Sequence, residues 1–563
     1  MLHLIPQPKD IQIRPGFLKA DRFTFDPSGW DRRVAKLAAK LPQDPQGAFL
    51  RMKVSGQEGE SYTLTVSESA VTIEAPGPAG AFYGLQTLRQ LLRQGQIPCL
   101  VIADAPDFSH RGFYHDATRG KIPTTETLKE LIDQMAFLKL NSFQLYVEHT
   151  FAFRECQELH PATGCLTGEQ MEELDSYCRE NFIDFIPSVS TFGHLYELLN
   201  LPQYRHLRVA KEVEQPWNFW RARMLHHTID PLHPESFPLV CSLLDQYAPH
   251  FTSDSFNICC DETFDLKNYP DDSLDKGRLY VDFVQKIVSH VQKKGKRVMM
   301  WADILLQHPE TISELPQDVV FLNWNYAANP PQAQVEKLAS MGRQQIVCPG
   351  TSTWSHLCED VDTEEQNISH MAHYAKKYGA LGILNTNWGD WANPCSLELA
   401  QYGLALGAAK SWQESTQTGP SLDEAVDKLI YRRDGGMERL RAVSRLHRHI
   451  GWNHFMRCYF ARRYEGKTDV SPFTRQELEQ VQREYRALAP LLEGDDRYSR
   501  EMALAAQGLC LIAQLYGKIA GWDVEEIVDC ESWLASYRRS WLERNQESEL
   551  GRIEEVFRFC ANL

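Results

Sequence analysis

The sequence predicts a (β/α)8 TIM barrel of the α/β class, with a small N-terminal α+β domain before it and a helical C-terminal region after it. Eight short apolar runs alternate with amphipathic helical patterns between residues 106 and 410. Residues 1–105 instead combine short alternating runs with one clear helical pattern, and residues 411–563 are charged and helix-patterned with few β-rich runs. These three observations predict three domains with these boundaries.

The N-terminal domain is predicted from two kinds of periodicity. Residues 62–66 and 71–74 alternate between apolar and polar side chains, which is typical of a β-hairpin. Residues 79–93 place Phe82, Leu85 and Leu88 on one face of a helix. The segment 104–107, Asp-Ala-Pro-Asp, reads as a linker into the barrel.

The barrel is predicted from the order of its strands and helices. The expected strands are 112–115, 142–147, 182–189, 256–260, 297–300, 319–322, 345–348 and 381–384. Between them we expect helices over 125–139, from Thr167 with Gln170 as a capping box, and from Arg278 to a stop at Gly295. Eight strands alternating with helices favour a closed barrel over an open doubly wound sheet.

Composition excludes several classes of protein. With 43% hydrophobic and 24% charged residues the chain lies in the globular range, and its net charge of −16 disfavours a nucleic-acid or anionic-membrane partner. We expect no signal peptide and no membrane span, because no segment approaches the apolar length that a span needs. The 14 cysteines are scattered without zinc-site spacing. We therefore expect a cytoplasmic protein with reduced thiols.

Polar and aromatic side chains follow every predicted strand. In chain order they are Asp116; Glu148 and His149; His194; Asp261 and Glu262; Trp301 and Asp303; Trp324 and Tyr326; Trp354; and Asn387, Trp388 and Asp390. A barrel enzyme builds its active site at these strand ends. Indole rings bind the apolar faces of sugars and carboxylates bind their hydroxyls, so this set indicates a pyranose pocket.

Each of these residues also has an ordinary structural explanation. A strand-end Trp often packs in the core, and a lone Asp often caps a helix or a turn. His194 alone could be structural, and Glu148 could simply pair with an Arg. The functional interpretation depends on their joint occurrence in register with eight strands.

Four motifs extend this interpretation. They are His110-Arg111-Gly112 with Asp116 and Arg119, the run Leu145-Tyr-Val-Glu-His-Thr-Phe151, Phe192-Gly193-His194, and Cys260-Asp-Glu-Thr-Phe264. On these residues the chain resembles the glycoside hydrolase family 20 β-N-acetylhexosaminidases, in their bacterial branch, over residues 1–410. The Asp-Glu pair that ends the fourth strand is the most specific of them.

The resemblance implies an exo-acting, retaining, substrate-assisted mechanism. Glu262 would be the general acid and then the general base. The 2-acetamido oxygen of the substrate would attack C1 and form an oxazolinium ion, while Asp261 orients the acetamido group. Two adjacent carboxylates would also raise one pKa, which suits an acid.

The resemblance further implies the residues that bind the terminal N-acetylhexosamine. Arg111 would bind O3 and O4, and Asp390 would bind O4 or O6. Tyr326 would donate to the acetamido oxygen. Trp301, Trp324, Trp354 and Trp388 would line the pocket, with Glu148 and His194 beside it. No metal and no cofactor are expected, because the histidines are dispersed and no phosphate-binding glycine loop is present.

The chain departs from the family pattern at several positions. Asn257 and Cys259 stand where the family has His and Gly, His149 stands where an acidic residue is expected, and Asn387 and Asn393 replace Asp and His. These departures leave open the choice between GlcNAc and GalNAc and the identity of the natural glycan. The sequence also leaves open the role of the C-terminal region and whether the protein forms a homodimer. Two alternatives also stay open: a glycosidase using Glu262 with Glu148 or Asp303, and a barrel that binds sugar without cleaving it.

Overall fold

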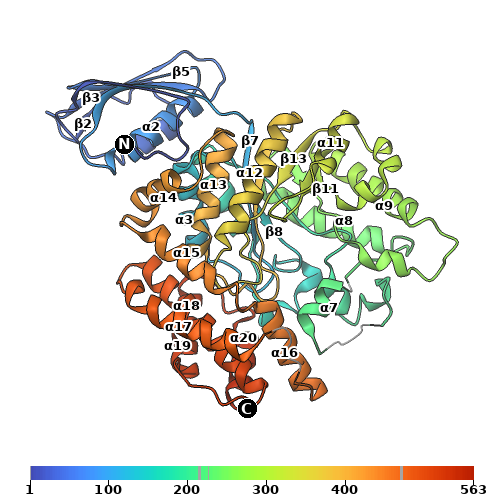
Figure 1. The fold of residues 1–563 in the computed structure, drawn as a ribbon. Coiled ribbons are helices and arrows are strands. Elements are labelled where there is room, and N and C mark those ends of the chain that lie inside the picture. Colours follow the sequence, from blue (N-terminus) through green and yellow to red (C-terminus); the bar gives the residue numbers. More distant parts are fainter. Residues whose placement is uncertain (1, 213–216, 226, 469–472) are drawn as a thin grey trace.

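The computed structural model describes residues 2–563 except 213–216, 226 and 469–472. Its strands form a six-stranded mixed sheet and an eight-stranded parallel sheet. Figure 1 shows the N-terminal sheet, in blue, at one end of the barrel and the C-terminal helices, in orange and red, towards the other.

The N-terminal sheet has the strand order β1-β6-β4-β5-β3-β2. Its strands are β1 (Asp10–Phe17), β2 (Phe23–Thr24), β3 (Ala48–Val54), β4 (Tyr62–Val66), β5 (Ala70–Ala75) and β6 (Pro98–Asp104). The predicted hairpin is confirmed, because β4 and β5 pair antiparallel. Helices α1 (Arg32–Ala38) and α2 (Pro78–Leu92) pack together, and α2 covers the buried side chains of β4 and β5.

The barrel strands run in the order β10-β11-β12-β13-β14-β7-β8-β9. They are β7 (His110–Asp116), β8 (Ser142–Tyr146), β9 (Asp184–Phe185), β10 (Ser255–Asn257), β11 (Arg297–Trp301), β12 (Val320–Trp324), β13 (Gln345–Cys348) and β14 (Gly382–Asn387). Hydrogen bonds from Asn257 N–H to the Pro187 carbonyl and from Val189 N–H to the Asn257 carbonyl join β10 to the chain after β9. These bonds close the predicted barrel.

Helices separate the strands as predicted. They include α3 (Thr125–Phe137), α5 (Gly168–Glu180), α8 (Ser236–Tyr247), α9 (Lys276–Gln292), α10 (Asp303–Gln307), α11 (Ala333–Ser340), α12 (Val361–Lys377) and α13 (Gln401–Trp412). The capping box of Thr167 and Gln170 is present at the start of α5. Gly295, with a φ of 76°, lies just beyond the end of α9 in the left-handed conformation that favours glycine.

Two barrel strands are shorter than predicted. β9 covers two residues and β10 covers three. After β10 the backbone turns, because Cys259, Cys260 and Glu262 have φ values of 55°, 67° and 47°. This left-handed conformation cannot continue a strand, although the apolar side chains keep the pattern of one.

The C-terminal region is helical where it is described. Its longer helices are α15 (Gly436–Leu446), α16 (Trp452–Glu465), α17 (Arg475–Leu488), α18 (Arg497–Ile519), α19 (Cys530–Arg544) and α20 (Leu550–Ala561). The expectation that no segment has the length and apolarity of a membrane span was wrong for α18, whose mean hydropathy reaches 1.3. However, 78% of that apolar window is buried inside the fold, as in the central helix of a helical bundle.

Candidate active site

Asp261 and Glu262 follow β10 in the left-handed turn. The Glu262 N–H donates to Asp303 Oδ2 at 3.1 Å, which fixes the backbone of the turn. A Cβ on Gly193 would lie 2.3 Å from the Asp261 carbonyl oxygen, so only glycine permits this approach of the two chains. The Asp261 side chain is 10% exposed and that of Glu262 is 22% exposed, so Glu262 is the more accessible carboxyl.

His194 connects this carboxylate pair to a third carboxylate. Its Nε2 lies 3.1 Å from Glu262 Oε2 and 3.4 Å from Asp261 Oδ2. Its Nδ1 lies 4.0 Å from Glu148 Oε1, which also accepts a hydrogen bond from the Tyr146 hydroxyl at 2.7 Å. The chain thus forms a row of Glu148, His194 and Glu262 that leads from the protein interior to the accessible carboxyl.

The pKa shifts in this row agree with a buried cation between anions. Burial alone would lower the pKa of His194, but the Asp261 and Glu262 carboxylates raise it well above its ordinary value. Burial alone would raise the pKa of Glu148, but the His149 imidazole beside it and the charges of His194 and neighbouring arginines lower it to about 2. His194 is therefore protonated and Glu148 ionised at neutral pH.

His227, which the sequence analysis missed, orients His194. The two imidazole rings stack with centroids 4.4 Å apart. His227 Nδ1 accepts from the His194 N–H at 2.7 Å, and its Nε2 donates to the Met224 carbonyl at 2.9 Å, so it is the neutral tautomer. Burial and the nearby His194 charge lower the pKa of His227 to about 3.

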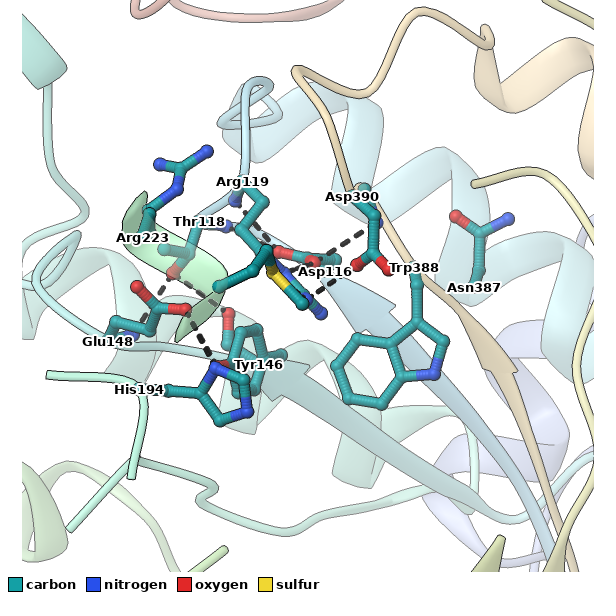
Figure 2. Close-up of polar contacts among 12 residues, drawn as sticks. Asp116, Thr118, Arg119, Tyr146, Glu148, His194, Arg223, Asn387, Trp388 and Asp390 are labelled. Atoms are coloured by element: carbon teal, nitrogen blue, oxygen red, sulfur yellow. Dashed lines mark hydrogen bonds and ion pairs between the residues drawn. The ribbon is translucent and has the colours of Figure 1, made fainter. Parts of the chain in front are cut away.

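Arg119 holds the opposite side of the site (Figure 2). Its Nε donates to Asp116 Oδ2 at 2.7 Å, and its Nη1 lies 2.5 Å from Asp390 Oδ1. The guanidinium also lies over the Trp388 ring, 4.8 Å from the centroid. The Asp390 side chain is 24% exposed. Burial raises the pKa of Asp390, and so does the nearby Glu262 charge. The two accessible carboxyl groups, Asp390 and Glu262, therefore lie on either side of one opening.

The aromatic residues form a connected set around this opening. The Trp388 Nε1 donates to the Tyr326 hydroxyl at 2.6 Å, Tyr326 stacks on Trp324, and Trp354 tilts against Tyr326. Trp324, Tyr326 and Trp354 are partly exposed. Trp301 is fully buried behind Trp388, with ring centroids 5.8 Å apart, so it supports the wall instead of facing solvent.

Asp303 is a buried carboxyl group beside the catalytic pair, and its pKa is raised. Burial and the Asp261 charge raise the pKa of Asp303 to about 7. Since its Oδ2 accepts the Glu262 N–H, its role here is to hold the turn after β10.

Arg111 is not part of this site, which corrects the sequence-based expectation. It is the second residue of β7, at the opposite end of the strand from Asp116, and its side chain is fully buried. It donates to both Glu60 oxygens at 2.7 and 2.8 Å, to the Tyr83 hydroxyl, and to the Phe108 and Lys139 carbonyls. Arg111 therefore holds the N-terminal domain against the barrel.

The departures from the family pattern occupy buried positions. Asn387 lies 3.1 Å from His115 and donates to the Thr351 and Thr353 hydroxyls. Asn257 donates to Gln144 at 2.9 Å inside the barrel. His149 Nδ1 is 3.8 Å from Glu148, and Asn393 packs against Gly389 next to Asp390.

Two groups of described residues are close enough to share a metal ion. They are His194, Asp261 and Glu262 in the site, and His206, His233 and Glu235 near the surface. In the first group the imidazole already bridges the two carboxylates, so hydrogen bonding accounts for the arrangement without an ion.

The site contains two functional side chains that the sequence-based list of site residues omitted, Arg119 and His227. A signal existed for Arg119, because it lies three residues after Asp116 at the end of the first barrel strand. His227 lies in the long insertion after β9, where no strand end marks it.

A (β/α)8 barrel with paired carboxylates and aromatic walls at its strand ends has the construction of a carbohydrate-active enzyme. Residues 108–437 match the catalytic domain of glycosyl hydrolase family 20, and residues 1–105 match domain 2 of that family. The chain belongs to glycosyl hydrolase family 20.

Individual relatives are more distant. A β-hexosaminidase of Porphyromonas gingivalis is 26% identical over 440 residues, which is 70% of this chain and 53% of that protein. A lacto-N-biosidase of Bifidobacterium bifidum is 25% identical over 294 residues, which is 49% of this chain and 25% of that protein. The chain thus spans about half, or less, of the length of these curated relatives.

Solved structures share the fold. A chitobiase of Flavobacterium johnsoniae superposes with a TM-score of 0.63 at 17% identity, covering 99% of both chains. A β-N-acetylhexosaminidase of Bacteroides fragilis superposes with a TM-score of 0.60 at 18% identity, covering 76% of this chain and 95% of that one.

Proposed function

We propose that the protein is an exo-acting, retaining β-N-acetylhexosaminidase that removes terminal β-linked GlcNAc or GalNAc by substrate-assisted catalysis. The observation that carries this proposal is the Asp261-Glu262 pair at the opening, with one carboxyl accessible and His194 bridging both. Membership of family 20 supports it, and so does the similarity to proteins named β-hexosaminidases.

Glu262 is the proton donor in this proposal. It lies 3.1 Å from the protonated His194, which can supply the proton that Glu262 passes to the glycosidic oxygen. In the second step Glu262 removes a proton from the attacking water and returns it to His194. Glu148, ionised and buried, stabilises the His194 cation before the first transfer and after this return.

Asp261 receives the 2-acetamido group. Its Oδ1 is buried, and among the described residues it has no hydrogen-bond donor. A buried carboxylate oxygen requires a partner, and the acetamido N–H of the substrate supplies one. The negative charge of Asp261 also stabilises the positive charge that develops on this nitrogen during ring closure.

Arg119 and Asp390 replace Arg111 as the groups that bind the sugar hydroxyls. They form an ion pair at the opening, beside the Trp388 face. A guanidinium donates and a carboxylate accepts, so the pair can hold two neighbouring hydroxyls of a terminal ring.

The two-carboxylate alternative with Glu148 meets a geometric obstacle. The His194 ring stands between Glu148 and Glu262, and the Glu148 side chain is only 2% exposed. A nucleophile must reach C1 of the sugar, which a carboxylate behind an imidazole cannot do.

The test is hydrolysis of paired chromogenic β-glycosides, GlcNAc and GalNAc beside glucose and galactose, by the wild type, Glu262→Gln and Asp261→Asn. We expect turnover of only the acetamido sugars, with both variants impaired about 100-fold or more. The GlcNAc/GalNAc ratio gives the preference. Equal turnover of plain glucosides would contradict the proposal, and binding without turnover would favour the sugar-binding alternative.

We further propose that the protein works in a reducing compartment, the cytoplasm. Eleven of the 14 cysteines are buried, and the other three are partly exposed. Buried thiols at these positions suit a reduced protein. Light scattering of the purified protein, with and without reductant, tests this proposal, because oxidised thiols would aggregate the protein; full stability in oxidant contradicts the need for reduction. The same measurement distinguishes a monomer from a homodimer.

A further inference from the structure

The C-terminal helices contact the catalytic end of the barrel through one buried ion pair. Glu549, at the start of α20, accepts from Arg223 Nη1 at 2.7 Å and from Nη2 at 3.4 Å. It also accepts from the Trp220 Nε1 at 3.3 Å. The Arg223 and Glu549 side chains are 2% and 4% exposed, so almost no water screens the pair.

Arg223 belongs to α7 (Phe219–Leu225), a helix in the insertion after β9. The same insertion reaches the site, because Met224 Sδ lies 3.6 Å from Arg119 Nη1 and its carbonyl accepts from His227. The C-terminal region holds α7 from outside: the Arg552 guanidinium lies 3.4 Å from the Phe219 centroid, and Phe460 of α16 packs on Trp220.

We propose that Glu549 is a positioning residue of the active site, which anchors α7 and neutralises Arg223 so that the row of Glu148, His194 and Glu262 keeps its charge balance. This inference assigns a task to the C-terminal region, and it rests on the proposed glycosidase function for its kinetic readout. Figure 2 shows Arg223 on the Glu148 side of the row.

The charges around this row define what an unbalanced Arg223 would change. The titratable groups that face Glu148 are Tyr146, His149, His194, Arg119 and Arg223. The groups that face Arg223 are Glu549, Glu148 and Glu197. The groups that face His194 are Asp261, Glu262 and His227. Without the Glu549 carboxylate, the Arg223 charge is no longer neutralised, so the electrostatic potential at Glu148, His194 and Glu262 becomes more positive. The proton then leaves His194 at lower pH.

The experiment compares wild type, Glu549→Gln, Arg223→Met and the double variant by pH profiles of kcat/KM on a chromogenic GlcNAc glycoside. We expect Glu549→Gln to lose about 10- to 100-fold in kcat/KM and to move the alkaline limb down by about 0.5 pH unit or more. Arg223→Met should move the limb up, and the double variant should restore it. Glu554→Gln, on the same helix with Arg538 and Arg558 as partners, should match the wild type.

Hydrogen exchange of peptides that cover α7 provides a readout without turnover. We expect faster exchange in Glu549→Gln and unchanged exchange in Glu554→Gln. Unchanged α7 exchange, or an alkaline limb that stays in place in both single variants, would overturn the inference. A wild type that hydrolyses no acetamido glycoside would instead overturn the proposed function, and the exchange data would still decide whether Glu549 anchors α7.

Discussion

At the scale of single residues, two arginines of one strand and its following turn have opposite tasks. Arg111 donates to Glu60 of the N-terminal domain, whereas Arg119 donates to Asp116 and pairs with Asp390 at the opening. Position along β7 decides the difference, because only residues beyond the C-terminal end of a barrel strand reach the catalytic face.

This difference predicts separate effects of two matched substitutions. Arg119→Met should lower kcat/KM on GlcNAc glycosides about 100-fold, because the sugar hydroxyls lose a charged donor. Arg111→Met should leave kcat/KM nearly unchanged but lower the free energy of unfolding by about 3 kcal/mol, since Glu60 loses its partner. Steady-state kinetics and thermal unfolding measure both effects. A large loss of kcat/KM in Arg111→Met, with little loss in Arg119→Met, would show that Arg111 belongs to the active site.

Gly193 is predicted to be essential for the position of Asp261. In Gly193→Ala the new Cβ would meet the Asp261 carbonyl oxygen at 2.3 Å, so the catalytic turn must move. We expect a loss of about 100-fold in kcat/KM with little change in circular dichroism. Gly451→Ala is the control, because nothing lies within 4 Å of its added Cβ. Equal activity of both variants would show that the turn adapts.

At the scale of elements, the sequence predicted which strands and helices exist better than where they end. Apolar runs and the Thr167-Gln170 capping box are local signals, and the structure confirms the elements they indicate. The end of β10 had no such signal, because Cys259 and Cys260 look like strand residues and turn only through their backbone conformation. That conformation depends on the tertiary contacts of Gly193 and Asp303.

Two buried carboxyl groups near the start of α12 predict a pH-dependent stability. Burial raises the pKa of Glu359 to about 8 and that of the neighbouring Glu364 well above its ordinary value. The folded protein therefore holds protons that the unfolded chain releases near pH 4.5. Because the folded state binds more protons, the contribution of these two groups to the free energy of unfolding is most favourable below that pH and falls as pH rises towards 8.

The measurement is the midpoint of thermal unfolding from pH 5 to pH 8. For each proton that the folded state retains, the free energy of unfolding falls by about 1.4 kcal/mol per pH unit over this window. Glu359→Gln should flatten the decline, whereas Glu336→Gln, at an exposed position of α11, should keep it. A wild-type midpoint that rises with pH would mean that other groups dominate.

At the scale of the whole molecule, the two accessory regions contact different ends of the barrel. The N-terminal domain contacts the start of β7 through Glu60, and the C-terminal region contacts the insertion beside the catalytic row through Glu549. The sequence indicated both regions by composition and periodicity. It could not indicate the Arg223–Glu549 pair, because the two residues are far apart in the chain and neither lies in a motif.

The central claim is that the substrate's own acetamido oxygen attacks C1 while Asp261 holds its N–H. The most direct test measures kcat/KM of the wild type on a series of aryl β-glycosides whose acetyl group carries no, one, two or three fluorine atoms. Fluorine withdraws electrons from the carbonyl oxygen, so kcat/KM should fall steeply with each added atom. A flat series, with the fluorinated substrates cleaved as fast as the parent, would contradict the claim and assign the attack to a protein carboxylate.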